Sequence, residues 1–149
     1  RFVIPNTVIL IYEKAFSLNL TLEMITFGEN VETIGDEAFS GCENLVNVNF
    51  NNAPIKSIGT KAFERCHSLD TIVLPTQLEK LGSSVFMGCS QLVEIYFSNT
   101  ILEIGRNCFT GCTSLETIYT DFDFVDQLKV IFAQNNEKFI DYITGISRN

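Results

Sequence analysis

A repeat of about 23 residues constrains the fold of this polypeptide more than any other feature of its sequence. Five phenylalanines recur at this spacing, and they are Phe16, Phe39, Phe63, Phe86 and Phe109. An isoleucine or leucine stands five residues before each phenylalanine, and a leucine stands six residues after it. A unit of this length cannot bury its own apolar face, so neighbouring units must stack to close a shared core. The repeat therefore predicts a solenoid.

Each unit follows the pattern Ile-Gly-x-x-Ala-Phe-x-x-Cys-x-x-Leu-x-x-Ile-x-Phe. Its last part places apolar residues at alternate positions, which is typical of a strand with one buried face. Parallel strands are therefore expected near residues 24–27, 47–50, 71–74, 94–97 and 117–120. The Gly-x-x-Ala-Phe-x-x-Cys part predicts one short helical or 3₁₀ turn that faces the core. Its glycine is interpreted as a turn residue, because glycine tolerates backbone angles that other residues resist.

The stretch from Leu69 to Cys89 carries the pattern as Leu-x-x-Ile-x-Leu-Pro-x-x-Leu-x-x-Leu-Gly-x-x-x-Phe-x-x-Cys. It resembles the BspA-like leucine-rich repeat, also called the Treponema-type leucine-rich repeat, almost position for position. The resemblance covers about residues 1–124, with local departures at Tyr12, Asn19 and Thr120. The expected fold is an α/β repeat solenoid of leucine-rich-repeat type. It would be a right-handed, curved stack with a parallel β-sheet on one face and short helical turns on the other.

The repeat divides the sequence into two parts. Residues 1–124 are predicted to hold the leucine-rich repeats, as a partial repeat over residues 1–7 followed by about five coils of one repeat each. The partial repeat indicates either a piece of a longer array or a domain without a conventional cap. Residues 125–149 are predicted to form a helical C-terminal cap of two short helices, with Asp126 placed to cap the first. A disordered linker is the alternative, which the density of apolar residues disfavours.

Composition excludes several classes of protein. Hydrophobic residues make up 46% of the sequence, which is enough to bury a core and excludes a disordered polypeptide. Eighteen acidic against ten basic residues give a net charge of −8, and no run of Lys or Arg offers a surface for nucleic acid. No apolar run approaches the ~18–20 residues that span a bilayer, so no membrane insertion is expected. No targeting segment is visible, and the compartment stays open.

The repeat accounts for all five cysteines. Cys42, Cys66, Cys89 and Cys112 each stand three residues after a repeat phenylalanine, and Cys108 replaces an alanine. We expect a ladder of buried thiols that act as small hydrophobes and contact backbone groups. Disulfides are disfavoured because in-register side chains point the same way, and a zinc site because the sequence has one histidine.

No constellation of residues predicts catalysis, a metal or a cofactor. His67 adjoins Cys66, but adjacent residues on a turn diverge by ~100°, so a surface histidine is favoured over a nucleophile–base pair. The Asn19 amide is expected to satisfy backbone groups rather than to carry a glycan on its Asn-Leu-Thr sequon. An acidic surface is favoured over a weak cation site at Asp121, Asp123 and Asp126. The protein is therefore predicted not to be an enzyme.

Outward positions of the predicted strands are the candidate partner-binding residues. Because core residues alternate with them, they form columns on the exposed face of the sheet. These columns place Tyr96 one repeat from Tyr119, so the two rings can stack ~5 Å apart. Tyrosine is enriched at protein interfaces, although such residues also simply favour strands. The predicted site comprises Asn47, Asn49, Thr71, Val73, Glu94, Tyr96, Thr117 and Tyr119.

These patterns support a non-enzymatic scaffold for protein–protein interaction. The resemblance implies a surface or secreted module for adhesion and host contact, because BspA-like proteins of bacteria and protist parasites are typically of that kind. Its partner would be a protein or an extracellular-matrix component. The alternatives are a structural spacer of a longer repeat array and a cytoplasmic interaction or regulatory module. An enzyme is disfavoured, and the patterns predict no oligomeric state.

Overall fold

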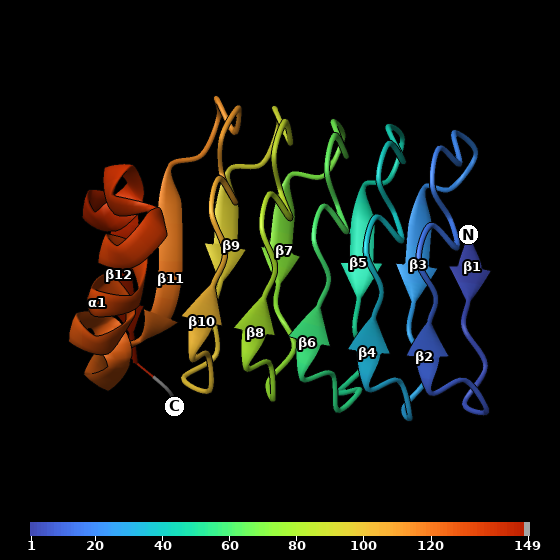
Figure 1. The fold of residues 1–149 in the computed structure, drawn as a ribbon, viewed down its shortest axis with the longest axis horizontal. Helices are drawn as coiled ribbons and strands as arrows, with labels where there is room; N and C mark the ends of the chain where they lie inside the picture. The colour runs from blue at the N-terminus through green and yellow to red at the C-terminus, as the bar shows by residue number, and fades with distance from the viewer. Residues whose placement is uncertain (148–149) are drawn as a thin grey trace.

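The computed structural model describes residues 1–147. The polypeptide winds into coils that stack along one axis, with the N-terminus at one end and the helices at the other (Figure 1). One strand of each coil lies on one side, which we call the front face. The front strands are β1 (Phe2–Val3), β3 (Met24–Thr26), β5 (Asn47–Asn49), β7 (Thr71–Val73), β9 (Glu94–Tyr96) and β11 (Thr117–Asp121). The predicted repeat solenoid with parallel strands is confirmed.

The front strands pair one repeat with the next. Ile25 of β3, for example, lies opposite Phe2 of β1 and Val48 of β5. The middle residue of β3, β5, β7 and β9 is buried, and its two neighbours are exposed or half-buried. This alternation is the one that the sequence predicts. The front face nevertheless consists of two sheets, in the orders β1-β3-β5 and β12-β11-β9-β7.

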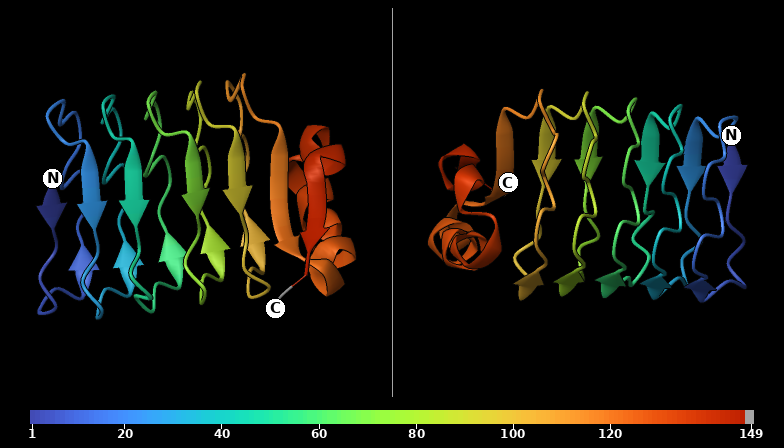
Figure 2. Two further views of the ribbon diagram at one scale, coloured as in Figure 1. Left: turned by 180° about the vertical axis from the view of Figure 1, so that it is seen from behind. Right: turned by 45° about the horizontal axis from the view of Figure 1, so that its top comes forward.

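The side that the sequence analysis assigned to helical turns carries a second parallel sheet, which we call the back sheet. Its strands are β2 (Leu10–Ile11), β4 (Thr33–Ile34), β6 (Ser57–Ile58), β8 (Lys80–Leu81) and β10 (Glu103–Ile104). They pair in the order β10-β8-β6-β4-β2, behind the front strands (Figure 2). These short strands precede the Gly-x-x-Ala-Phe-x-x-Cys segment of each repeat, and the sequence pattern does not predict them. A strand of two residues is too short to show the alternation by which strands are recognised in a sequence.

The Ala-Phe segment between the back sheet and the front face forms a ladder of turns. In the second full coil the N–H groups of Glu37, Phe39 and Gly41 donate to carbonyl oxygens of the following coil at 2.9, 2.8 and 2.8 Å. Glu37 and Gly41 have positive φ angles of 54° and 72°. The backbone is left-handed at two of these three positions, and all three N–H groups face the following coil. The intervening N–H groups of Ala38, Ser40 and Cys42 donate to the carbonyl three residues earlier at 3.3, 3.1 and 3.1 Å. The segment therefore combines 3₁₀-type bonds within a coil, as predicted, with bonds between coils.

The glycine after each back strand is required by close packing between coils. A Cβ atom on Gly82 would lie 2.6 Å from the Thr60 nitrogen, and one on Gly105 would collide with the Ser83 nitrogen. Positive φ occurs instead at Gly41, Gly88 and Gly111. The predicted reason for the repeat glycine, a special backbone angle, is therefore wrong. Tyr12 occupies the same repeat position after the edge strand β2 and is 74% exposed.

The repeat phenylalanines stack through the core. Their ring centroids are 5.0, 5.1, 5.9 and 6.1 Å apart along the series Phe16, Phe39, Phe63, Phe86 and Phe109. All but the first are fully buried, and neighbouring rings are nearly parallel. Burial of one such side chain contributes ~1.5–3 kcal/mol, so the stack is a main source of stability.

Helical elements close the C-terminal end of the stack. They are η1 (Phe122–Phe124), α1 (Val125–Asn135) and η2 (Glu137–Tyr142), and strand β12 (Ile143–Ile146) follows them. Phe132 of α1 is fully buried and stacks on Phe109 at 5.6 Å. The N-cap of α1 is Phe124 rather than Asp126, and it makes no capping bond through its side chain, so the predicted capping role is wrong. Residues 148–149 of the predicted cap lie outside the described residues.

Strand β12 was not predicted by the sequence analysis. It pairs parallel with β11, with Ile118 opposite Ile143 and Tyr119 opposite Thr144. Ile143 is buried and Thr144 is exposed, as the alternation of a strand requires. This pairing covers the edge of β11, and β12 becomes the last strand of the sheet.

A side-chain amide fixes α1 to the last coil in the place of a backbone group. In the earlier coils the carbonyl of the back strand accepts from the glycine N–H of the next coil, as Leu81 does from Gly105 at 2.8 Å. The Ile104 carbonyl accepts instead from Asn135 Nδ2 at 3.3 Å. The amide therefore supplies the donor that a further coil would have supplied.

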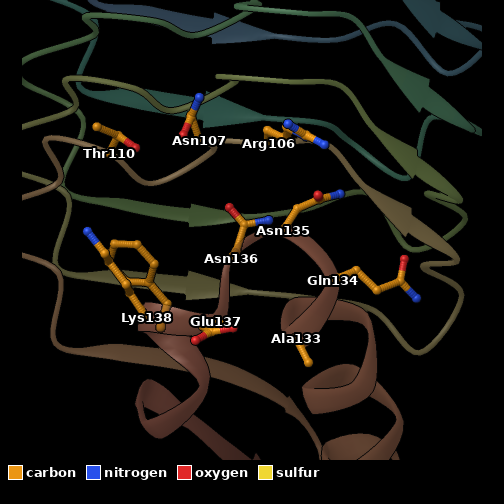
Figure 3. A pocket seen from close by; sticks show the side chains of 10 residues that line it. Arg106, Asn107, Thr110, Ala133, Gln134, Asn135, Asn136, Glu137 and Lys138 are labelled. Carbon is orange, nitrogen blue, oxygen red and sulfur yellow. The ribbon is translucent and has the colours of Figure 1, made fainter.

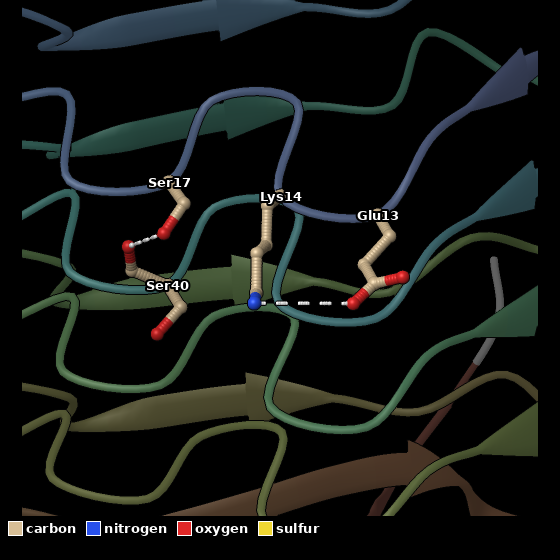
Figure 4. Close-up of polar contacts among 4 residues, drawn as sticks. All are labelled: Glu13, Lys14, Ser17 and Ser40. Carbon is tan, nitrogen blue, oxygen red and sulfur yellow. Dashed lines mark hydrogen bonds and ion pairs between the residues drawn. The ribbon is translucent and has the colours of Figure 1, made fainter.

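Ion pairs contribute little to holding the coils together. The one ion pair between described residues joins Lys14 Nζ to Glu13 Oε1 at 4.0 Å, with the side chains 58% and 66% exposed (Figure 4). A surface pair of this kind contributes ~0–1 kcal/mol. Neighbouring coils are joined by hydrogen bonds, such as the one from Ser17 Oγ to the Ser40 carbonyl at 3.3 Å (Figure 4).

Candidate partner-binding face

The candidate site occupies the outward positions of β5, β7, β9 and β11. Each of these strands buries its second residue, which turns the residues on either side of it toward solvent. The exposed members are Asn47, Asn49, Thr71 and Val73. The half-buried members are Glu94, Tyr96, Thr117 and Tyr119. All eight side chains therefore lie on the front face.

The structure does not bring all eight residues onto one sheet. The described strands have no ladder between β5 and β7, so Asn47 and Asn49 lie on a different sheet from the other six. The coil between them is one residue longer than the others, and the extra residue falls in the turn that holds Asn51 and Asn52, which have φ angles of 50° and 56°. A hollow of about 400 Å³ lies at this interruption, with Val73 on its far side. The six residues on β7, β9 and β11 form the continuous part of the site.

Tyr96 and Tyr119 form the centre of this continuous part. They lie opposite each other across β9 and β11, and their ring centroids are 4.6 Å apart with an interplanar angle of 24°. The predicted stack is confirmed. Since each ring covers one face of the other, the outer faces lie toward the neighbours in the column, which are Val73 and Thr144. The pair is a rigid aromatic surface with hydroxyl groups at its tips.

A carboxylate flanks the tyrosine pair. The Tyr96 hydroxyl donates to Glu94 Oε2 at 3.3 Å. Loss of water around the ring and the negative charge of Glu94 raise the pKa of Tyr96. Tyr96 therefore keeps its proton at neutral pH and remains a hydrogen-bond donor. None of the residues in β3, β5, β7, β9 and β11 is Lys or Arg, so the face is neutral to acidic.

Strand β12 adds a position to the face that the sequence analysis missed. Thr144 extends the column of Tyr96 and Tyr119 and is exposed. The sequence holds no clear signal for this strand, because Ile143 and Ile146 are three residues apart and do not alternate with the period of two that marks a strand.

The cysteines form the predicted ladder of buried thiols. The four that follow a repeat phenylalanine donate to the carbonyl of such a phenylalanine in a preceding coil, as Cys66 Sγ does to Phe39 at 3.3 Å. Cys108 Sγ donates to the Gly82 carbonyl at 3.0 Å. Burial raises the pKa of Cys66 well above its ordinary value and raises that of Cys108 to about 11. Thiols in this state are neutral at physiological pH and act as packing groups rather than nucleophiles.

The other polar candidates do not assemble into a reactive site. Cys66 is fully buried while His67 is half-buried. Asn19 Oδ1 accepts from the N–H groups of Thr21 and Leu22 at 3.1 Å each, so its amide satisfies backbone groups as predicted. Within residues 1–147 no group of three or more His, Cys, Asp or Glu side chains is placed to hold a metal ion. No helix in the described range is long and apolar enough to cross a membrane.

The sequence pattern of the BspA type leucine-rich repeat region matches residues 1–138 in six copies. The protein belongs to the BspA-type leucine-rich repeat family. The match extends past residue 124 to include Phe132, which follows Phe109 by the same repeat interval that separates earlier members of the stack. BspA-type leucine-rich repeat proteins generally bind other proteins and are generally non-enzymatic.

Solved leucine-rich repeat structures share the fold of this BspA-type protein. A leucine-rich repeat protein from Treponema pallidum is 30% identical with a TM-score of 0.76, over 78% of this chain and 56% of that one. A leucine-rich cell surface protein from Faecalibacterium prausnitzii is 30% identical with a TM-score of 0.76, over 80% of this chain and 31% of that one. A leucine-rich repeat protein from Bacteroides ovatus is 25% identical with a TM-score of 0.68, over 99% of this chain and 42% of that one.

The match therefore spans only 31% to 56% of the length of these three relatives. No curated protein sequence matches this one.

Proposed function

We propose that this protein is an adhesion module of the cell surface or of a secreted protein, and that its front face binds a protein partner. The observation that carries the proposal is the stacked pair of Tyr96 and Tyr119 on strands without Lys or Arg. Tyrosine combines apolar area with a hydrogen-bonding tip, which suits the centre of a protein interface. Glu94 and Thr117 flank the pair and supply a polar edge.

The rigidity of the face supports a binding role. Ile95 and Ile118, which lie between the outward residues of β9 and β11, are fully buried beneath the tyrosines. A side chain that is already held by packing loses little conformational entropy when a partner binds. The tyrosine pair is therefore organised for contact before the partner arrives.

The partner is an extracellular-matrix or host-surface protein with a neutral or basic contact surface. The net charge of −8 and the Glu94 carboxylate favour such a surface over an acidic one. A surface location is supported by the relative from F. prausnitzii, which is described as a cell surface protein.

Capture of matrix proteins by the immobilised protein tests the proposal. Three forms are compared: the natural protein, Tyr96→Ala/Tyr119→Ala, and a matched control, Tyr12→Ala/Tyr142→Ala. The control removes the other two of the four tyrosines, which are 74% and 36% exposed and lie away from the site. We expect the natural protein and the control to retain the same matrix protein and the first variant to lose it. Equal capture by all three would move the site off the front face, and no capture by any would favour the spacer function.

A further inference from the structure

The hollow of about 400 Å³ on the front face, where β5 and β7 do not pair, is lined by four asparagines. We call it the asparagine hollow, and the four residues are Asn47, Asn49, Asn51 and Asn52. None of the described residues that line it is charged. The pocket between the last coil and the junction of α1 and η2 differs in this respect, because Arg106, Glu137 and Lys138 line it (Figure 3). The asparagine hollow is therefore a neutral, amide-rich site in a protein of net charge −8.

The interruption leaves one ladder bond unmade inside the hollow. In the pairs β1–β3, β3–β5, β7–β9 and β9–β11, the N–H group that follows the first strand donates to the next coil, as Phe27 does to the Asn49 carbonyl at 2.8 Å. The equivalent groups at the interruption are the Phe50 N–H and the Val73 carbonyl. Within residues 1–147 the Phe50 N–H has no acceptor, although Phe50 is buried. Both residues line the hollow, so a donor and an acceptor of the backbone are left for a ligand.

The two coils separate only along the front face. In the same coils the rings of Phe39 and Phe63 stack at 5.1 Å, and the Phe39 N–H donates to the Ala62 carbonyl at 2.8 Å. A peptide strand between β5 and β7 would need ~4.8 Å on each side, and coils held in this way are not spread far enough to admit one. A single hydroxyl group can instead accept from the Phe50 N–H and donate to the Val73 carbonyl.

Two of the four amides are held in position by the turn that contains the extra residue. Asn49 Oδ1 accepts from the Asn51 N–H at 2.9 Å, and Asn51 Nδ2 donates to the Phe27 carbonyl at 3.2 Å. Each amide keeps its other polar atom for a ligand, so Asn49 Nδ2 can donate and Asn51 Oδ1 can accept. Because both side chains are already fixed, binding costs little conformational entropy.

The chemistry of the hollow indicates a neutral sugar. A charged ligand would lose water without meeting an opposite charge, and an apolar ligand would leave the amides without partners. A sugar hydroxyl both donates and accepts, as the amides and the unpaired backbone groups together require. The volume of about 400 Å³ lies within the ~300–1,000 Å³ of small-ligand sites and suits a mono- or disaccharide.

We propose that the asparagine hollow binds a neutral sugar residue, either as a free sugar or as part of a glycan. One hydroxyl lies between the Phe50 N–H and the Val73 carbonyl, and others bond to the amides of Asn49 and Asn51. The proposal does not rest on Tyr96 and Tyr119, which lie on the other front sheet, so the outcome at one site does not decide the other.

Amide shifts in the ¹⁵N-labelled protein test the proposal. The neutral probes are D-glucose, D-galactose, D-mannose and N-acetyl-D-glucosamine, each as the free sugar and as its methyl glycoside. N-acetylneuraminic acid is the charged probe, and N-acetyl-Ala-Ala-Ala-amide is the peptide probe. We expect at least one neutral sugar to give saturable shifts of the Phe50 amide and the Asn49 side-chain amide, with a dissociation constant below ~10 mM. Equal binding of its methyl glycoside identifies a glycan, and binding of the free form alone identifies a free sugar.

A matched pair of variants makes the test specific. Asn49→Asp keeps the oxygen that accepts from the Asn51 N–H and replaces Nδ2 by a second oxygen, so it is expected to weaken binding at least ~5-fold. Asn6→Asp is the control, because Asn6 is exposed outside the hollow and its Oδ1 accepts from the Glu29 N–H at 2.9 Å. It makes the same change of charge and is expected to bind normally.

Three results would overturn the proposal. They are absent or non-saturating shifts with all four neutral sugars, tighter binding of N-acetylneuraminic acid or of the peptide, and equal affinity in the two variants. Matched urea midpoints show that each variant is folded.

Discussion

The Asn136 side chain inserts into the last turn of the solenoid: its Nδ2 donates to the Gly105 carbonyl at 2.9 Å, and its Oδ1 accepts from the Cys108 N–H at 3.3 Å. In an earlier coil the equivalent groups bond to each other directly, as the Ala62 N–H does to the Gly59 carbonyl at 3.2 Å. The carboxamide supplies a donor and an acceptor from two separate atoms of one side chain. The buried Asn136 therefore joins the cap to the repeats through bonds that define where α1 sits.

Replacement of Asn136 by alanine is expected to lower the free energy of unfolding by ~1–3 kcal/mol, because it leaves the Cys108 N–H without an acceptor in a buried setting. Urea unfolding followed by circular dichroism measures the change. Asn44→Ala is the matched control, since Asn44 is exposed and its Nδ2 donates to the Leu20 carbonyl at 2.7 Å. If the two variants lost equal stability, the amide at Asn136 would not be the joint between cap and coil.

Phe63→Ala is expected to cost ~3–5 kcal/mol by leaving a cavity in the middle of the phenylalanine stack. Phe63 is fully buried, and its ring stacks on Phe39 at 5.1 Å and on Phe86 at 5.9 Å. Phe122→Ala, at a position that is 77% exposed, controls for the loss of a phenylalanine and should cost under ~0.5 kcal/mol. A loss below ~1 kcal/mol at Phe63 in denaturant unfolding would show that the stack does not carry the core.

Gly82→Ala distinguishes close packing from backbone flexibility as the role of the repeat glycine. A Cβ atom would lie 2.6 Å from the Thr60 nitrogen, and backbone moves aside less readily than a side group does, so a loss of ~1–3 kcal/mol is expected. A glycine with ordinary φ and free space would instead gain ~0.4–1 kcal/mol on substitution. A lower unfolding midpoint for Gly82→Ala would support close packing, and a higher one would contradict it. Tyr12→Ala, at the equivalent position beside the edge strand, is the control and is expected to leave the midpoint unchanged.

The features that could be predicted from the sequence are those whose residues recur in every repeat. Leu69, Ile72 and Phe63 have counterparts at fixed spacing in every unit, so the buried positions, the front strands and the thiol ladder could be placed from the spacing alone. The stack of Tyr96 on Tyr119 could be predicted because the two residues hold the same position in neighbouring repeats. Because the pattern occurs five times, a prediction drawn from it does not depend on any single residue.

The remaining features depend on contacts that a single unit does not encode. The back strand Leu10–Ile11 is two residues long and shows no period, and the crowding at Gly82 exists only between coils. Phe132 continues the repeat spacing, but the apolar residues around it follow a helical period, so the sequence does not identify it as a member of the phenylalanine stack. The pocket between the last coil and the end of α1 lies where the ladder of turns ends, which the sequence of a repeat cannot indicate.

Thiol burial predicts a stability that falls at alkaline pH. Burial raises the pKa of Cys108 from 9.0 to about 11. The unfolded polypeptide therefore releases the proton first, so the stabilisation is fully present below the unfolded pKa and is lost as pH rises toward the folded one. Cys108 alone accounts for a loss of ~1 kcal/mol between about pH 8 and pH 10.

Urea unfolding of the natural protein and of Cys108→Ala at the two pH values measures this contribution. The variant is expected to lose ~1 kcal/mol less than the natural protein over the same interval. An identical pH dependence in both proteins would mean that the Cys108 thiol is not held protonated by the fold.

The affinity of Tyr96→Ala/Tyr119→Ala for the captured partner, measured beside its unfolding midpoint, tests the binding face most directly. The account predicts that the dissociation constant rises by at least ~30-fold, about 2 kcal/mol, while the urea midpoint stays within error of the natural protein. The half-buried rings stand outside the buried core, so their loss should spare the fold. An unchanged dissociation constant in a folded double variant would contradict the account and move the interface away from the front face.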